Sequence, residues 1–310
     1  MLTIKLLTYL IGLVDLAPHL YDNLKKMINC VIIHKGYQPY LKYNLEISSK
    51  NNYVYLIGDD SLEFLGSKFE NVEFINIENF ENSKNLIHLK EHFKNFNSNS
   101  YDFEWFCFAR VFIINDFLEQ NELENVFHID SDNVLLTNIS NIEFYKKNAY
   151  LIPPNQEVYR MSGSIHSGLI DKSFCEKFIN LYKDIYVNKS KFHLIEDKIN
   201  YHTKQNIPGG ICDMTLYYLL QSEEILDTQN LFFPVKDKSG SEFIFMNNFS
   251  NSEGPNGKNS FKFEKGQISI INRSKIFDTV NKKKYNLCNI HFQGGAKKKL
   301  NRLFKYKISY

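Results

Sequence analysis

Three short apolar segments near the start of the chain limit the folds that it can adopt. Residues 30–34, 53–58 and 72–77 have the length and the β-branched or aromatic content of buried strands. A helical pattern over residues 40–49 separates the first two segments. Because parallel neighbours need a crossover between them, strand, helix and strand at this spacing predict an α/β fold with a mostly parallel sheet flanked by helices.

A pair of carboxylates follows a fourth apolar segment, residues 126–129. Asp130-Ser131-Asp132 places two acids one residue apart at a strand end, where they can share a divalent cation and leave positions open for phosphate oxygens. Ligands of open parallel sheets bind beyond the carboxyl ends of the strands, and we expect His34, Asp59 and Asp130 at that edge. The alternative is a plain acidic turn, because Asp suits turns.

The clearest helical pattern covers residues 103–120. Its predicted apolar stripe consists of Phe103, Cys107, Val111, Ile114 and Leu118. Arg110 lies beside this stripe, and a buried arginine is costly unless an anionic group receives it. The alternative is a surface arginine whose stem lies along apolar side chains.

The remaining patterns alternate between strands and helices. Residues 150–152 and 163–170 are expected to form strands, the second of which carries His166. Residues 173–187 and 213–221 are expected to form helices, and residues 268–271 and 287–292 late strands. Residues 237–265, rich in Gly, Ser and Asn, are expected to form loop and hairpin.

A second group of functional residue types lies near the C-terminus. His291 would complete a site begun by two carboxylates, and a mixed N and O ligand set suits Mn²⁺ better than Mg²⁺. Gly294 and Gly295 permit close approach of the backbone to a phosphate, and Lys297 supplies a positive charge for a diphosphate. The alternative is a histidine at a strand end, a glycine turn and a solvated lysine.

The third motif is Gly209-Gly210, which leads into a helix that opens near Asp213. A carboxylate is favoured at a helix N-terminus by the helix dipole, so Asp213 could simply cap the helix. The functional interpretation is a carboxylate that holds a sugar hydroxyl or acts on an acceptor.

The ordered set of these motifs resembles glycosyltransferases of the GT-A fold, and most closely the glycogenin-like family 8. The resemblance covers about residues 29–297 and implies a role for each matching residue. Asp130 would contact the ribose and the metal, and Asp132 and His291 would bind Mn²⁺ (or Mg²⁺). Gly294 and Lys297 would hold the diphosphate. His34 and Ser131 are added as donor-binding candidates, because they lie at the same sheet edge.

The same resemblance implies that Arg110 and Asp213 face the donor sugar. The chain departs from the family 8 pattern, because Met214 stands where a Gln is usual and Lys298-Lys299 stand where Pro-Trp is usual. Stereochemistry is therefore left open. An inverting enzyme needs a base for the acceptor hydroxyl, and Asp213 and His166 are the catalytic candidates.

The predicted function is transfer of a sugar from a nucleotide-sugar, most simply a UDP-sugar, to a glycan, lipid-linked or protein acceptor. Three alternatives remain open. A sugar nucleotidyltransferase would carry a glycine-rich phosphate loop near its first strand, and residues 34–37 hold one glycine. A haloacid-dehalogenase-like phosphatase would carry its Asp-x-Asp on the first strand of its domain. A catalytically inactive protein of the same fold would bind carbohydrate or nucleotide without turnover.

Composition bears on partners and location. A net charge of +2, from 37 basic and 35 acidic residues, argues against nucleic-acid binding. Five scattered cysteines predict free thiols and a cytoplasmic location. We expect residues 1–28 to form a helical extension too short to span a bilayer, and residues 29–310 to form one GT-A domain.

Within that domain, residues 29–140 are predicted to bind the nucleotide-sugar, and residues 141–297 to bind the acceptor and carry the catalytic residues. Residues 298–310 form a basic tail. This tail is expected either to make peripheral contact with an anionic membrane that carries a lipid-linked acceptor or to be solvated.

Overall fold

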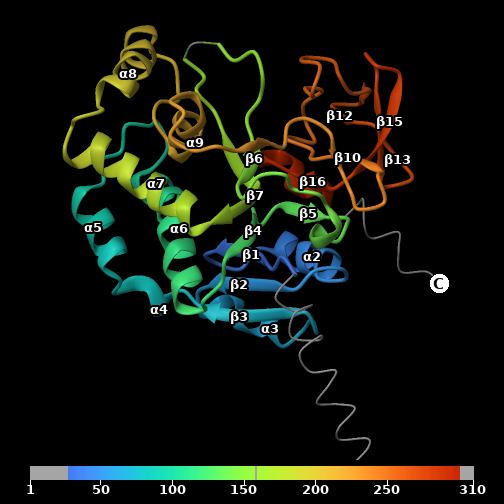
Figure 1. The fold of residues 1–310 in the computed structure, drawn as a ribbon, viewed down its shortest axis with the longest axis horizontal. Helices are drawn as coiled ribbons and strands as arrows, with labels where there is room; N and C mark the ends of the chain where they lie inside the picture. Colours follow the sequence, from blue (N-terminus) through green and yellow to red (C-terminus); the bar gives the residue numbers. More distant parts are fainter. Residues whose placement is uncertain (1–26, 158, 301–310) are drawn as a thin grey trace, which may run out of the picture.

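The computed structural model describes residues 27–157 and 159–300. Its centre is a seven-stranded sheet in which four of the six neighbouring pairs are parallel (Figure 1). In spatial order its strands are β3 (Val72–Asn76), β2 (Val54–Gly58), β1 (Cys30–His34), β4 (Asn125–Ile129), β7 (Ser164–Asp171), β6 (Ala149–Leu151) and β8 (Gln229–Asn230). The prediction of an α/β fold with a mostly parallel sheet is confirmed.

The antiparallel strand β7 decides what meets at the functional edge of the sheet. It pairs with β4 so that Ile129 lies opposite Ser167, and the amide of Asp130 donates to the carbonyl of His166 over 3.1 Å. The start of β7 therefore lies beside the carboxyl ends of β1 and β4. His166 is placed next to the Asp-x-Asp segment by the backbone ladder.

Alternation along the strands divides the interior between the two faces of the sheet. On β1, Val31 and Ile33 belong to one apolar cluster, whereas Cys30 and Ile32 belong to another. Successive side chains of a strand point to opposite faces, so a strand covered on both sides is apolar throughout. The first cluster includes side chains of the helices Lys84–His92, Tyr101–Gln120, Lys172–Tyr182 and Asp213–Ser222, and the second includes side chains of the helices Pro39–Ser48 and Glu63–Gly66.

The helices surround this sheet (Figure 1). They are α2 (Pro39–Ser48), α3 (Glu63–Gly66), α4 (Glu78–Glu81), α5 (Lys84–His92), α6 (Tyr101–Gln120), α7 (Lys172–Tyr182) with a π-helical turn at Lys183–Val187, α8 (His193–Gln205) and α9 (Asp213–Ser222). The predictions for α2, α6, α7 and α9 are confirmed. Helices α5 and α8 were not predicted, because few of their side chains are apolar and those few are spread over short segments.

The apolar stripe predicted on α6 is wrong at its first member. Phe103 is 57% exposed. Farther along, Val111, Phe112, Ile113 and Ile114 are all buried, so the helix is surrounded by protein and not covered on one face alone. A buried helix has no single stripe, because every side of it meets apolar neighbours.

Three small sheets, built mostly from the C-terminal third, lie to the right of the central strands in Figure 1. Their strands are β9 (Val235–Lys236), β10 (Glu242–Ile244), β13 (Ile270–Ile271), β14 (Lys275–Asp278) and β15 (Lys283–Leu287) in one sheet, β11 (Phe263–Glu264) with β12 (Gln267–Ile268), and β5 (Asn133–Leu135) with β16 (Asn289–His291). The predicted loop and hairpin over residues 237–265 holds only β10 and β11, and β14 was not predicted.

Some predictions fall outside the described residues. These are nearly all of the N-terminal extension and most of the basic tail. The division of residues 29–310, the cytoplasmic location and the membrane contact stay predictions. No helix in residues 27–157 and 159–300 is long and apolar enough to cross a membrane. All five cysteines are free thiols, of which Cys30, Cys175 and Cys288 are buried.

Two glycines connect the segment before α6 to the start of α9. Gly210 has a φ of +130°, and a Cβ placed on it would lie 2.0 Å from the carbonyl oxygen of Phe96. The Ile211 amide donates to that same oxygen over 3.0 Å. This close backbone approach needs glycine, and it fixes the residue three positions before Asp213.

We predict that Gly210→Ala lowers the free energy of unfolding by at least about 1–3 kcal/mol, the usual cost of a residue held in a disallowed backbone region. Urea denaturation would measure it. Gly240→Ala is the matched control, because Gly240 has a φ of +82° and open space around its Cβ position. Equal losses in the two variants would show that the contact with Phe96 contributes nothing.

Candidate functional site

The carboxyl edge of the sheet borders a cavity of about 750 Å³. Ten of the residues proposed from the sequence line this one cavity, whereas Gly295 does not. The ten are His34, Arg110, Asp130, Ser131, Asp132, His166, Asp213, His291, Gly294 and Lys297. They come from β1, α6, β7, α9, β16 and the loops between them, so the fold brings together residues up to 263 positions apart (297 − 34). Asp59, expected at the same edge, lies outside the lining and instead accepts a hydrogen bond from the Gly36 amide.

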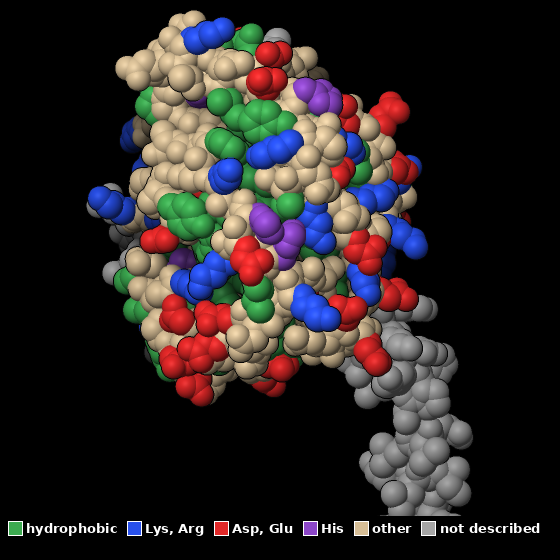
Figure 2. Space-filling model, turned by 90° about the vertical axis from the view of Figure 1, so that its left-hand side faces the viewer, with side chains coloured by type: hydrophobic (Ala, Val, Ile, Leu, Met, Phe, Trp, Pro, Cys, Tyr) green, Lys and Arg blue, Asp and Glu red, His purple; other side chains and the backbone are tan. Residues whose placement is uncertain are grey.

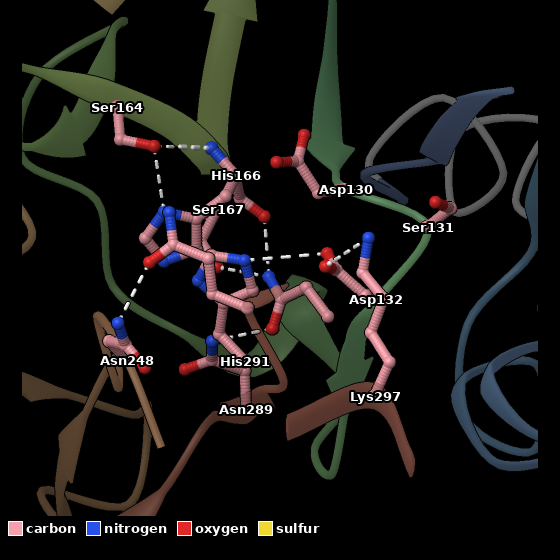
Figure 3. Close-up of polar contacts among 12 residues, drawn as sticks. Asp130, Ser131, Asp132, Ser164, His166, Ser167, Asn248, Asn289, His291 and Lys297 are labelled. Atoms are coloured by element: carbon pink, nitrogen blue, oxygen red, sulfur yellow. Dashed lines mark hydrogen bonds and ion pairs between the residues drawn. The ribbon is translucent and has the colours of Figure 1, made fainter. Parts of the chain in front are cut away.

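Asp132 is the centre of the polar contacts in the cavity (Figure 3). One of its carboxylate oxygens lies 3.4 Å from Nε2 of His291, and the other lies 3.2 Å from Nζ of Lys297. Potential ligand atoms of Asp130, Asp132 and His291 all lie within 4.8 Å of one another. Two carboxylates and an imidazole at this separation can hold one divalent cation.

The orientation of His291 supports this interpretation. Its Nδ1 lies 2.6 Å from the carbonyl oxygen of Asn247, which fixes the proton on that nitrogen and turns Nε2 toward Asp132. Burial lowers the pKa of His291, but Asp132 and Asp130 outweigh it, so the pKa is raised. A histidine whose second nitrogen donates to a carbonyl is typical of metal sites. The donor set therefore fits a divalent cation.

Arg110 joins the Asp-x-Asp segment to α9. Its guanidinium donates to Asp130 over 2.6 Å and to Asp213 over 2.8 Å, and its side chain is 14% exposed. The surface alternative for Arg110 is thus wrong. Burial raises the pKa of Asp130, but Arg110 and the nearby histidines outweigh it and hold that pKa well below its usual range.

Asp213 is the first residue of α9, and Cys212 is the N-cap. Its carboxylate is buried and accepts from Arg110, from the Tyr217 hydroxyl over 3.1 Å and from the Met214 amide over 2.9 Å. Asp213 is not the N-cap itself, although it accepts from one amide of the first turn, and its other two donors, Arg110 and Tyr217, are side chains that line the cavity. A carboxylate with three donors is fixed in place and suits orientation of a ligand.

His166 stacks on His291 with ring centroids 4.1 Å apart. Its Nδ1 lies 2.8 Å from Ser164 Oγ, its Nε2 lies 3.4 Å from the Met246 carbonyl oxygen, and the residue is 1% exposed. Burial and the neighbouring His291 hold its pKa well below the usual value, so the ring is neutral. Both nitrogens have protein partners. This arrangement favours support of His291 over the predicted role as a base.

Two buried asparagine side chains next to the site were not predicted from the sequence. The Asn133 side chain donates to the carbonyl of His166 and to Ser167 Oγ, and accepts from Asn289 over 2.6 Å. Asn289 also bonds both backbone groups of Met246. The only signal was position, since Asn133 follows Asp132 directly and Asn289 precedes His291 by two residues.

The donor-binding candidates at the β1 end lie around Tyr40. Ser131 Oγ is 3.4 Å from the Tyr40 hydroxyl, and Nζ of Lys297 lies 5.1 Å from the Tyr40 ring centroid. Burial and Lys297 lower the pKa of His34, which packs edge-on against Tyr40. Gly294 has a φ of +59° and open space around its Cβ position, which leaves its backbone accessible. An aromatic ring beside two cationic or polar groups suits a nucleoside with its phosphates.

A second group of ligand-type side chains lies on α5, outside this cavity. It consists of His88, Glu91 and His92, and Figure 2 shows the face of the molecule on which α5 lies. Basic and acidic side chains are interspersed over that face, with a group of acidic side chains near its lower edge. Charge there is mixed and not of one sign.

Comparisons with known proteins find a weak similarity in structure and no match in sequence. No family model matches the chain, and no curated protein matches it. Among solved structures it is similar to a chain described as "PaToxG Glycosyltransferase", with 13% identity, a TM-score of 0.37, and coverage of 69% of this chain and 79% of that one. A likeness of this degree carries no conclusion on activity. The resemblance to family 8 stays a prediction from the motifs.

We predict that Arg110→Lys lowers the free energy of unfolding by about 1–3 kcal/mol, because a single ammonium cannot span two carboxylates and one is left buried without its partner. Urea denaturation near neutral pH would measure the loss. Arg273→Lys, in the turn between β13 and β14, is the matched control. A loss no greater than that of the control would contradict the bridging role.

The lowered pKa of Asp130 also predicts how the stability of the fold changes at acidic pH. A carboxyl with a lowered folded-state pKa stabilises the fold above its unfolded-state pKa of about 3.9, and this contribution is lost as the pH falls toward the folded-state value. The wild type should therefore lose stability below about pH 4, more steeply than Asp130→Asn. Urea denaturation with chelator present, repeated from neutral pH downward, compares them. Parallel curves would contradict the assignment.

Proposed function

We propose that this protein is a metal-dependent glycosyltransferase of the GT-A type that transfers a sugar from a nucleotide-sugar to an acceptor hydroxyl. The observation that carries the proposal is the approach of Asp130, Asp132 and His291 to one another beside Lys297, at the carboxyl edge of a mostly parallel sheet. Such a site suits a diphosphate that leaves with a cation.

The contacts suggest how a donor would lie. The nucleoside would occupy the end near His34, Tyr40 and Ser131, where an aromatic ring and small polar groups meet. The diphosphate would lie against Lys297 and the backbone at Gly294. The sugar would then extend toward the cavity wall formed by Arg110 and Asp213. A UDP-sugar is the simplest donor, and the acceptor would be a glycan, a lipid-linked glycan or a protein.

In the reaction, the bond between the anomeric carbon and the diphosphate oxygen breaks, and the acceptor oxygen forms a new bond to that carbon. Mn²⁺ (or Mg²⁺), held by Asp130, Asp132 and His291, would supply Lewis-acid stabilisation of the leaving diphosphate. Lys297 would neutralise part of the same charge. Arg110 and Asp213 would orient the sugar, since their mutual ion pair fixes both side chains. The proton of the acceptor hydroxyl leaves with the solvent or with the diphosphate.

The proposed glycosyltransferase activity can be tested with a panel of nucleotide-sugars. Release of nucleotide diphosphate from each would be measured with Mn²⁺ and with a chelator. Metal-dependent release from one donor supports the proposal and names the sugar. Calorimetry with UDP and Mn²⁺ separates the remaining cases when nothing is released. Binding without release supports an enzyme that needs its acceptor or an inactive protein of this fold. Absence of both overturns the proposal.

We predict that Asp132→Asn lowers Mn²⁺-dependent release by at least about 100-fold, because one ligand is lost and both His291 and Lys297 lose their partner. Initial rates at saturating donor would measure this. Asp227→Asn is the matched control, since the Asp227 side chain is 76% exposed and forms a surface ion pair with Lys146. Near-normal turnover in Asp132→Asn would refute the metal assignment.

A further inference from the structure

A second buried carboxylate lies farther along the same cavity. Glu104 on α6 is 2% exposed and belongs to the cavity lining. Its Oε1 accepts from the Asn99 side chain over 2.7 Å, whereas its Oε2 is buried and has no hydrogen-bond partner among the described residues. Buried polar atoms without partners are rare, and each one costs stability.

No ion pair to Glu104 is formed by the residues that the structure describes. Lys198 on α8 donates instead to the carbonyl of Arg160 over 2.7 Å and to Thr215 over 2.9 Å. Burial raises the pKa of Glu104 and outweighs the hydrogen bond from Asn99, which lowers it; Asp213 adds a smaller increase, and Arg110 and Lys198 add smaller decreases. The carboxyl group is therefore kept at a position that is unfavourable for the protein alone.

The position of Glu104 follows from the helix. It precedes Arg110 by six residues, a displacement of about 9 Å along the axis of α6. Cys107 lies between them and also lines the cavity. A donor sugar held at one end by Arg110 and Asp213 would thus have its far hydroxyl groups near Glu104.

The support of Glu104 is connected to that of Asp213. Asn99, which holds Glu104, lies in the segment before α6, where Ser98 donates from its amide to the carbonyl of Gly209 over 3.0 Å. The same glycine pair leads directly into α9 and Asp213. The two carboxylates are therefore held by one connected piece of backbone, as recognition of a single ligand would require.

We propose that Glu104, held by Asn99, recognises a hydroxyl group of the donor sugar and selects the hexose that the enzyme uses. On binding, the Glu104 carboxylate would turn so that Oε2 faces the cavity and accepts a hydrogen bond from that hydroxyl, which removes the cost of the unpaired oxygen. A site built to hydrogen-bond a hydroxyl discriminates strongly against sugars that place it elsewhere. This inference rests on the proposed function, and it adds a specificity residue to the donor site.

Glu104→Gln tests the inference with little change of shape. The amide oxygen still accepts from Asn99, and only the free oxygen becomes a donor. Calorimetry with Mn²⁺ would compare binding of UDP, UDP-glucose, UDP-galactose and UDP-N-acetylglucosamine. We expect unchanged affinity for UDP and an affinity for the preferred UDP-sugar that is lower by about 10-fold to 100-fold, the usual effect of losing a hydrogen bond to a charged group.

Glu119→Gln, at the exposed end of α6, is the matched control and should change neither affinity. Asn99→Ala is a second variant, expected to weaken the UDP-sugar in the same direction, and thermal unfolding would check that each variant is folded. Equal losses for UDP and the UDP-sugar would show a structural role and overturn the inference. So would unchanged affinity and preference for all donors. Absence of UDP and Mn²⁺ binding in the wild type would instead overturn the proposed function.

Discussion

The antiparallel pairing of β5 with β16 is the contact on which the proposed site depends. Asn133 lies opposite His291 in this ladder, and the Phe292 amide donates to the Asp132 carbonyl over 2.9 Å. Residues more than 150 positions apart are thereby held with the side chains of Asp132 and His291 on the same cavity wall (Figure 3). The buried amides of Asn133 and Asn289 favour this register, because a one-residue slip would break the hydrogen bond between them.

Charge balance explains why so many ionisable groups can share one cavity. Asp130 and Asp213 lie within 2.8 Å of Arg110, and Asp132 lies 3.2 Å from Lys297. Each of these three carboxylates therefore has a cation without any ligand. In the proposed function, the diphosphate would offset the charge that a bound divalent cation adds.

The sequence was sufficient for six of the seven strands of the central sheet, the main helices and ten residues of the cavity lining, because these follow from apolar periodicity and from polar residues at strand ends. Asp-x-Asp after β4 and His291 at the end of β16 are local patterns. The sequence did not predict which of these side chains contact one another in the folded protein. That His166 stacks under His291, or that Arg110 spans two carboxylates, depends on β7 running antiparallel between β4 and β6. Helices α5 and α8 were missed because propensity and pattern are weak there, and packing on α6 and around Lys198 decides their structure.

Helix α6 connects the fold to the selectivity of the site. Most of its residues from Phe108 to Leu118 are buried, and an ionisable group on such a helix persists only when something receives it. Arg110 donates hydrogen bonds to two carboxylates of the protein. Glu104 accepts a hydrogen bond from one amide, and its other oxygen has no partner in the part of the chain that the structure describes. The two charged groups of this helix thus differ, because Arg110 has two protein partners and Glu104 has one. A hydroxyl-bearing ligand in the cavity would supply a second partner for Glu104, which makes the difference between the two residues a physical basis for substrate choice.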